Sequence, residues 1–329
     1  MKIENLRVNH LKNPRGYDMG KKQHFSWTVR EARGTKAEAS RLLISSDPEG
    51  EKALLDTGFC SGIRDPFYIT SLKLEPRKIY YWKAAVRSDI GEEAWSDTAS
   101  FETGKMGESW EAEWISCDSE EPRHPVFFRD FSSSEAVKSA RLYICALGLY
   151  EASLNGKRVG EEYLTPYCNN YERWLQYQSY DVTALLEKNN RLEVMLGNGW
   201  YKGRFGFSGK KDGYYGNEWL LIGELRLVYE DGSEEIIGTD ESWKLRRSGM
   251  YFSNLYDGEY CNENLRPAEE ERVLPASDDA ALKAKLTERL SPPVVVTELL
   301  TPKLIHTPKG ETVLDTGQNA DGIFRLNVR

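Results

Sequence analysis

The carboxylates of this chain are numerous but form no pattern that marks a catalytic pair. Neighbouring glutamates such as Glu161-Glu162 and Glu234-Glu235 lie beside predicted turns, where a solvated position explains them. A glycosidase needs two carboxylates on opposite sides of a sugar, one of them in a less polar setting. The four histidines lie far apart in the sequence, which gives no support to zinc binding or histidine-based catalysis. We therefore expect neither a catalytic residue nor a metal site.

Aromatic and amide side chains are concentrated between residues 161 and 183, in "EEYLTPYCNNYERWLQYQSYDVT". The segment holds five tyrosines and Trp174, with Asn169 and Asn170 in a predicted loop. Side-chain amides hydrogen-bond the hydroxyls of a sugar while an aromatic ring covers its apolar C–H face. Burial in a β-sheet core is the alternative for each single ring. The pattern predicts sugar or domain-interface contacts at Asn169, Asn170 and Trp174.

A second aromatic stretch, "LGNGWYKGRFGF" at residues 196–207, contains four glycines. Glycines cluster where the backbone turns sharply or where another group approaches it closely. The Gly-x-Gly in this stretch leads into no predicted helix, which argues against a dinucleotide site. We interpret the stretch as a structural corner. The alternative is that Trp200, Tyr201 or Arg204 faces a sugar or a neighbouring domain.

The elements that must position these side chains begin with a β-rich region over residues 1–107. "FSWTV" and "SRLLISS" have strand composition, and residues 80–87 alternate between apolar and polar side chains. Leu74-x-Pro76-x-x-x-Tyr80 is typical of the tyrosine corner that precedes a late strand in fibronectin type III domains. This region is therefore predicted to be a fibronectin type III-like β-sandwich.

Residues 108–268 are predicted to form a second antiparallel β-sandwich, of the jelly-roll kind. Asn155-Gly156 and Asp231-Gly232 each lie between alternating runs, which indicates hairpins. Asp181 is placed to cap a short helix over Val182–Glu187. Leu142, Ile144 and Ala146 are expected on one buried face. Predicted strands do not alternate with predicted helices as in βαβ units, so the sheets are expected to be antiparallel.

Residues 269–329 are predicted to be a linker helix and a partial third β-domain. The helix is expected over Asp279–Leu290, ended by Ser-Pro-Pro, and a hairpin is expected at residues 308–310. The last residues, "GIFRLNVR", read as a strand, so we expect this domain to be truncated. The predicted fold class is all-β, with tandem antiparallel sandwiches and one short helical linker.

Composition limits the partners that this chain can have. The 329 residues carry a net charge of −8, which argues against nucleic acid binding. No long apolar run suggests a signal peptide or a membrane span. The five cysteines are scattered and odd in number, as is typical of a reducing compartment. We expect a cytoplasmic protein with neither a nucleic acid nor a membrane as partner.

An ordered set of motifs resembles the N-terminal β-domain of bacterial α-L-rhamnosidases. It comprises "LNGKRVGEEYLTPYCNNYERWLQYQSYDVTALL", "LEVMLGNGWYKGRFGF" and "NLYDGEYCNENL", and it spans residues 110–266. The preceding fibronectin-like region is common in that family. "VLDTGQNADGIFRLNV" is similar to the start of the family's next domain. The resemblance therefore covers the front part of such an enzyme.

The resemblance implies an inverting glycosidase that releases terminal α-L-rhamnose from glycans or glycosides. Its catalytic barrel, with a glutamate base and an aspartate acid, would follow in the same polypeptide. The acidic motif of that barrel has no counterpart before Arg329, so this stretch alone is predicted to be inactive. Some relatives bind rhamnose through calcium, for which Asn169 and Asn170 are the candidate ligands here. The sequence has "YCNNYERW" where many relatives carry an aspartate-bearing loop, so no cofactor is expected. A stand-alone lectin-like protein is the alternative function.

Overall fold

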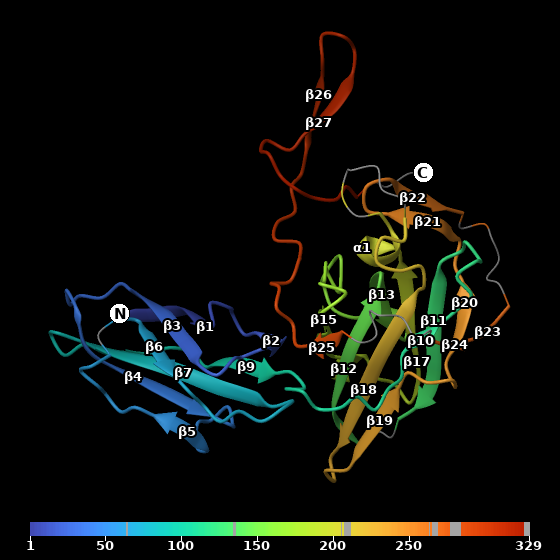
Figure 1. Ribbon diagram of the computed structural model, residues 1–329. Coiled ribbons are helices and arrows are strands. Elements are labelled where there is room, and N and C mark those ends of the chain that lie inside the picture. The colour runs from blue at the N-terminus through green and yellow to red at the C-terminus, as the bar shows by residue number, and fades with distance from the viewer. Residues whose placement is uncertain are drawn as a thin grey trace.

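The computed structural model describes residues 1–63, 65–133, 136–204, 206, 212–262, 264, 269–276 and 284–325. Within these ranges the chain is built from strands, with a single α-helical turn, α1 (Gly199–Lys202), and one 3-10 turn, η1 (Thr183–Leu185). Two β-sandwiches lie side by side, joined by the segment after β9 (Figure 1). Tandem sandwiches confirm the predicted all-β class.

The first sandwich packs a three-stranded sheet on a six-stranded one. The smaller sheet orders β1 (Lys2–Val8), β3 (Gln23–Arg30) and β6 (Phe67–Thr70). The larger sheet orders β2 (Arg15–Tyr17), β9 (Ala99–Thr103), β7 (Ile79–Ser88), β4 (Ala37–Ser45) and β5 (Ala53–Asp56), with β8 (Glu93–Trp95) on β7. The core between them includes Phe25, Leu42, Trp82 and Phe101, all nearly inaccessible to solvent.

The tyrosine corner predicted in this sandwich is confirmed. The Tyr80 hydroxyl accepts a hydrogen bond of 2.7 Å from the backbone N–H of Glu75, a few residues upstream. This bond ties the loop before β7 to the strand itself, as the motif requires. The ring of Tyr80 stacks on Phe101 with 5.2 Å between centroids, so the corner is also anchored in the core.

The second sandwich packs two six-stranded sheets on each other. One sheet orders β16 (Gln178–Asp181), β12 (Val137–Leu147), β18 (Leu220–Tyr229), β10 (Ile115–Ser116) and β24 (Leu274–Pro275), with β19 (Glu234–Gly238) on β18. The other orders β14 (Lys157–Arg158), β13 (Leu149–Leu154), β17 (Asn189–Gly197), β11 (Pro125–Ser132), β20 (Lys244–Arg247) and β23 (Glu271–Arg272).

Strand β12 is buried on both of its faces. Leu142, Ile144 and Ala146 point into the core between the two sheets, which confirms the face predicted from the alternation. Tyr143 and Cys145 point the other way, into a second apolar cluster on the outer face of the same sheet. The parallel pair β15 (Trp174–Gln176) and β25 (Lys285–Thr287) contributes to the covering of this outer face.

The predicted turns agree with the structure to different degrees. Asn155 and Gly156 have φ of 55° and 73°, which confirms a two-residue hairpin turn between β13 and β14. At Asp231-Gly232 only the glycine has positive φ, and a four-residue loop, 230–233, joins β18 to β19. The expected helix over residues 182–187 is shortened to η1, although the Asp181 carboxylate does accept the Thr183 N–H at 3.0 Å.

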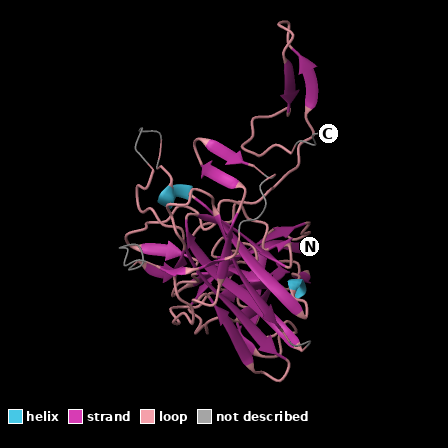
Figure 2. Cartoon of the chain, turned by 90° about the vertical axis from the view of Figure 1, so that its right-hand side faces the viewer, coloured by secondary structure: helices cyan, strands magenta, loops and turns pink. Residues whose placement is uncertain are grey.

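The linker helix expected over Asp279–Leu290 is wrong in its described part. Residues 277–283 lie outside the described ranges, and the remainder contains β25, which pairs in parallel with β15. Helix propensity is outweighed there because Leu286 packs against the outer apolar cluster. Further on, β26 (Lys303–His306) and β27 (Thr312–Asp315) form the hairpin predicted around Gly310. That hairpin projects away from both sandwiches, as Figures 1 and 2 show.

A small hairpin of β21 (Met250–Asn254) and β22 (Gly258–Cys261) lies near α1 (Figure 1). The described part of the strand expected at "GIFRLNV", residues 322–325, lies outside any strand. None of the described helices is long and apolar enough to cross a bilayer. The domain limits at residues 107 and 268 stay predictions, although β24 and β25 pair with strands of the second sandwich.

Candidate functional site

The stretch at residues 196–204, together with Gly148, forms a tight backbone crossing that we call the glycine corner. Gly148 has φ of +113°, and a Cβ placed on it would lie 2.3 Å from the carbonyl oxygen of Gly197. Gly199 has φ of +56°, and its Cβ would lie 2.9 Å from the backbone nitrogen of Leu149. Side chains are excluded at both positions, so these glycines are used for close approach.

The aromatic residues of the glycine corner are used mainly for packing. Tyr201 is fully buried, and its ring lies 5.2 Å from that of Tyr171, in the outer apolar cluster. It does not reach solvent in this structure. Trp200 is half-buried against the same cluster. The two phenylalanines of the stretch lie outside the described residues.

Arg204 is the charged member of the glycine corner and is held in place. Its guanidinium donates two hydrogen bonds to the Asp257 carboxylate, at 2.7 and 2.8 Å. It also lies 5.3 Å from the centre of the Tyr256 ring. Because about a quarter of the Arg204 side chain stays exposed, its outer edge remains able to contact another molecule.

The amide loop places its two asparagines differently. Asn169 is buried, and its Oδ1 accepts a hydrogen bond of 3.0 Å from the backbone N–H of Gln176, while its Nδ2 has no partner. Asn170 is exposed, and its carbonyl oxygen accepts the N–H of Arg173 and of Trp174. This turn holds Trp174 half-buried at the start of β15. The loop and the glycine corner meet through the Tyr171–Tyr201 contact.

A calcium site at these asparagines does not fit the residues around them. The Asn169 amide oxygen is already used by the backbone of Gln176, and calcium needs six to eight oxygen ligands. Within the described ranges, no group of three or more histidine, cysteine, aspartate or glutamate residues is arranged to hold a metal ion.

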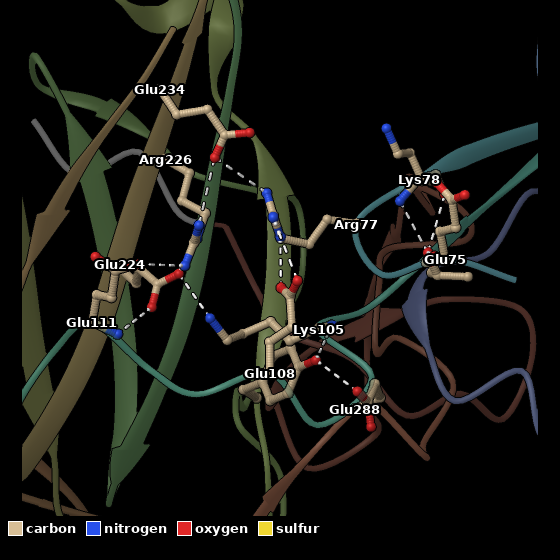
Figure 3. Close-up of polar contacts among 12 residues, drawn as sticks. Glu75, Arg77, Lys78, Lys105, Glu108, Glu111, Glu224, Arg226, Glu234 and Glu288 are labelled. Carbon is tan, nitrogen blue, oxygen red and sulfur yellow. Dashed lines mark hydrogen bonds and ion pairs between the residues drawn. The ribbon is translucent and has the colours of Figure 1, made fainter.

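A buried polar site that the sequence does not predict lies where the two sandwiches meet. Lys105, from the segment after β9, donates a hydrogen bond of 2.8 Å from Nζ to Glu224 Oε1 on β18. Both side chains are at most 1% exposed. Arg226 donates to the same carboxylate oxygen, and the backbone N–H of Glu111 donates to the other at 2.9 Å (Figure 3). We call these four residues the junction cluster.

Burial and hydrogen bonding act in opposite directions on the pKa of Glu224. Burial alone would raise it, but the bonds from Lys105, from the Glu111 backbone and from Arg226 hold the pKa below its usual range. Burial lowers the pKa of Lys105, and the contact with Glu224 only partly offsets this. The carboxylate therefore stays ionised at neutral pH, where it compensates the buried cationic groups.

A second group of contacts surrounds the junction cluster. Arg77, in the loop before β7, donates to Glu108 at 2.7 Å and lies 3.6 Å from Glu234 on β19 (Figure 3). The Tyr177 hydroxyl accepts the backbone N–H of Lys105 at 2.6 Å and donates to Glu288 at 3.1 Å. These contacts connect the first sandwich, the second sandwich and the segment that carries β25.

A third contact region lies at the other edge of the same interface. Arg289 makes two hydrogen bonds, of 2.5 and 2.6 Å, to the Glu162 carboxylate, and both side chains are largely buried. The Arg289 guanidinium also lies 5.5 Å from the Tyr17 ring of the first sandwich. The expectation that Glu162 is a solvated turn residue is therefore wrong, since a cation more than a hundred residues away draws it inward.

Comparison with family models identifies both sandwiches. Residues 135–298 match the model described as the alpha-L-rhamnosidase N-terminal domain. Residues 3–107 match the model of a Rha78A-like, N-terminal immunoglobulin domain, whose sandwich architecture the fibronectin type III fold shares. The first of these matches includes β25, in the segment expected to be a linker.

The characterised proteins that this chain resembles in sequence are alpha-L-rhamnosidases. The chain is 28% identical to an alpha-L-rhamnosidase of an Alteromonas species, over 99% of this chain and 39% of the relative. An alpha-L-rhamnosidase of Streptomyces avermitilis is 35% identical over 58% of this chain and 19% of its own length. The chain thus spans about two fifths, or less, of the curated relatives it matches.

Solved structures extend the likeness to the placement of the domains. An alpha-L-rhamnosidase from Dictyoglumus thermophilum aligns with a TM-score of 0.77 and 29% identity, over 97% of this chain and 39% of its own. One from Aspergillus terreus aligns with a TM-score of 0.80 and 27% identity, over the same shares. Because such alignments cover both sandwiches together, the relative placement of the two is shared.

Proposed function

This chain belongs to the alpha-L-rhamnosidase family, as the N-terminal portion of such a protein, and on that basis we propose that it supports a catalytic barrel in the same polypeptide. The whole protein would hydrolyse terminal α-L-rhamnose from glycans or glycosides by inversion. The observation that carries this proposal is the likeness to solved rhamnosidases across 97% of the chain. It favours the accessory role over a stand-alone lectin-like protein, because a lectin needs no such shared pair of domains.

The support role follows from the physics of the junction. Charged hydrogen bonds are directional, and a buried carboxylate that loses its partners is costly, so the sandwiches have one favoured mutual orientation. Two domains with a fixed orientation can hold a third at a defined angle. The partly exposed rings of Trp174 and Trp200 and the hairpin β26–β27 then remain available for contacts with the rest of the polypeptide.

We propose that Trp174, Trp200 and Arg204 provide those contacts, either to the barrel or to a sugar. All three are partly exposed. Tyr201 and Asn169 act through packing, since both are buried, and Asn170 orients Trp174. A cytoplasmic location is part of the proposal, supported by the five free cysteines.

Hydrolysis of an aryl α-L-rhamnoside tests the main proposal. Residues 1–329 alone are expected to give no turnover above background, whereas the chain extended through the following domains hydrolyses the substrate. A general acid and a general base each contribute roughly 10²–10⁴-fold, and neither is expected here. Measurable turnover by residues 1–329 would place an active site in the sandwiches and overturn the assignment.

The contact residues are tested by Trp200→Ala, measured by melting temperature and by rhamnose titration in parallel. A contact role predicts an unchanged melting temperature with weaker rhamnose binding, or weaker activity of the extended chain. A large drop in melting temperature with no other defect would assign Trp200 to packing alone.

A further inference from the structure

A cleft of about 610 Å³ lies between the two sandwiches, at the edge of their interface where β2 meets β16. The segment at residues 11–14 and β2 form one wall, and β16 forms part of the other. The walls touch at Gly16, where an added Cβ would lie 2.6 Å from Ser179 Oγ. Figure 1 shows β2 at the end of the first sandwich that faces the second. Ligand sites are common at such domain boundaries, and the proposed support role leaves this cleft without a use.

The charged residues that line the cleft do not balance. They are four cations and three anions, namely Lys12, Arg15, Arg141 and Arg289 against Glu102, Glu162 and Asp181. Arg289 pairs with Glu162, and Arg141 pairs with both Glu102 and Asp181. Lys12 is exposed and makes no ion pair with any described residue. The excess charge of the lining is positive although the whole chain carries a net charge of −8, so the cleft favours an anion.

Two polar side chains of the lining use only part of their hydrogen-bonding capacity. Asn13 Oδ1 accepts the backbone N–H of Ser100 at 3.1 Å, whereas the amide nitrogen has no partner among the described residues. Asp181 accepts on Oδ1 from the N–H and the hydroxyl of Thr183, and its ion pair with Arg141 also ends on Oδ1. Its Oδ2 has no hydrogen-bond partner in the described part of the chain. One wall thus offers a donor and the other an acceptor.

These groups are open to solvent, so a ligand can reach them. Lys12 and Asn13 are exposed, and the side chains of Arg15 and Asp181 are 43% and 61% exposed. The first three residues belong to the first sandwich, and Asp181 belongs to the second. A small molecule in the cleft can therefore contact both sandwiches at once.

The available groups define the chemistry of the ligand. Lys12 and Arg15 suit a carboxylate, which forms charge-assisted hydrogen bonds with both kinds of cation. The free oxygen of Asp181 accepts from a hydroxyl group, and the amide nitrogen of Asn13 donates to one. A neutral sugar would leave the excess positive charge uncompensated, and a doubly charged ester would bring a second negative charge towards Asp181. A small hydroxy acid with one negative charge matches the lining, and the cleft volume is within the range of small-molecule sites.

We propose that this cleft binds one singly charged sugar acid of the uronate class, with its carboxylate at Lys12 and Arg15 and its hydroxyl groups at Asn13 and Asp181. The ligand contacts both sandwiches, so its binding also stabilises their mutual orientation. The inference goes beyond the proposed function, since it concerns neither the glycosidic bond nor the release of rhamnose. The cleft is separate from the amide loop and the glycine corner.

The test is a calorimetric titration of residues 1–329 with D-glucuronate and with D-galacturonate, each compared with its neutral parent, D-glucose or D-galactose. Each pair shares the ring hydroxyls and differs in the carboxylate, whereas acetate has the carboxylate without the hydroxyls. We expect saturable binding of at least one uronate, at least about tenfold tighter than that of its parent sugar and of acetate. No saturable binding of either uronate, or equal binding of the parent sugar or of acetate, overturns the proposal.

Two variants of the cleft and one control locate the binding. Lys12→Gln removes the excess charge and should weaken uronate binding at least about tenfold. Lys2→Gln removes the same charge from an exposed position on β1, outside the cleft, and should leave the binding unchanged. Asn13→Asp keeps an oxygen that can accept from Ser100, and aspartate, like asparagine, tolerates the φ of 45° at this position. Because it places a negative charge at the cleft, it should abolish uronate binding while the melting temperature stays within a few degrees.

Uronate binding that is as tight in Lys12→Gln or in Asn13→Asp as in Lys2→Gln overturns the proposal. Hydrolysis of an aryl α-L-rhamnoside by the extended chain tests the proposed function separately, so the two can fail independently.

Discussion

At the domain junction, Glu224 accepts hydrogen bonds from Lys105 and Arg226 in a site closed to water, whereas at the glycine corner one stretch of backbone presses directly on another. The junction depends on charge and on the compensation of each buried ion. The corner depends on the absence of side-chain atoms. Both hold the backbone in one arrangement. The junction can be disrupted by removing a charge or by acid, whereas the glycine corner can be disrupted only by adding side-chain atoms.

The largest expected effect is at the junction, with Glu224→Gln. The amide removes the negative charge and leaves Lys105 buried without its carboxylate partner, whereas Arg226 keeps longer ion pairs with Glu111 and Glu234. The loss of the buried pair should cost about 3–5 kcal/mol of unfolding free energy. Urea denaturation measures it. The control is Asp130→Asn, which breaks an ion pair with Arg191 on the surface of the same sandwich and should cost at most about 1 kcal/mol. Equal losses for the two variants would contradict the assignment of Glu224 as the central residue of the junction.

Acid should act on the same group. The pKa of Glu224 is lower in the folded chain than the ordinary value of about 4.3, so its stabilising contribution is complete above that pH. The contribution is lost as the pH falls further, through the folded-state pKa. The melting temperature should therefore drop more steeply below pH 4.3 in the native chain than in Glu224→Gln. The other carboxylates titrate in both proteins, so any difference between the two profiles comes from Glu224. Melting temperatures that fall equally with pH in the two proteins would contradict the prediction.

Gly148→Ala is the corresponding test at the glycine corner. The backbone strain of an alanine in such a conformation costs roughly 1–3 kcal/mol, and its Cβ would also meet the Gly197 carbonyl. Gly58→Ala is the matched control, because Gly58 has φ of +57° with open space around it. The difference between the two melting temperatures measures the close approach together with the greater backbone strain at φ of +113°. No difference would mean that neither the contact with Gly197 nor that conformation requires glycine at position 148.

The sequence predicted the corner and missed the junction for a physical reason. Glycines and aromatic rings that lie within twelve residues of one another reveal a corner by local composition. Lys105 and Glu224 are separated by 119 positions, and each looks like an ordinary surface charge until the sheets are assembled. Glu162 was misread in the same way, because its partner is Arg289.

Local patterns predicted the long strands of the two sandwiches better than they predicted the short segment around Leu286. The alternation of Leu142, Ile144 and Ala146 gave the correct core face, and the Tyr80 corner was found from its spacing. The helix expected near Leu286 failed because its pattern of apolar residues also suits a strand packed on a neighbouring sheet. In such a short segment tertiary contacts, rather than propensity, determine the structure.

The smallest expected effect is that of Arg204→Ala, at the exposed edge of the glycine corner. In residues 1–329 it should cost at most about 1 kcal/mol, because its pair with Asp257 is partly exposed to water. Arg41→Ala is the control, since Arg41 makes a similar exposed pair with Asp56 in the first sandwich. In the extended chain the two variants should separate. If Arg204 contacts the following domain, only its removal lowers the melting temperature further or slows hydrolysis. If Arg204→Ala and Arg41→Ala change the melting temperature and hydrolysis of the extended chain equally, Arg204 stabilises only the glycine corner. The proposed contact with the following domain would then rest on Trp174 and Trp200.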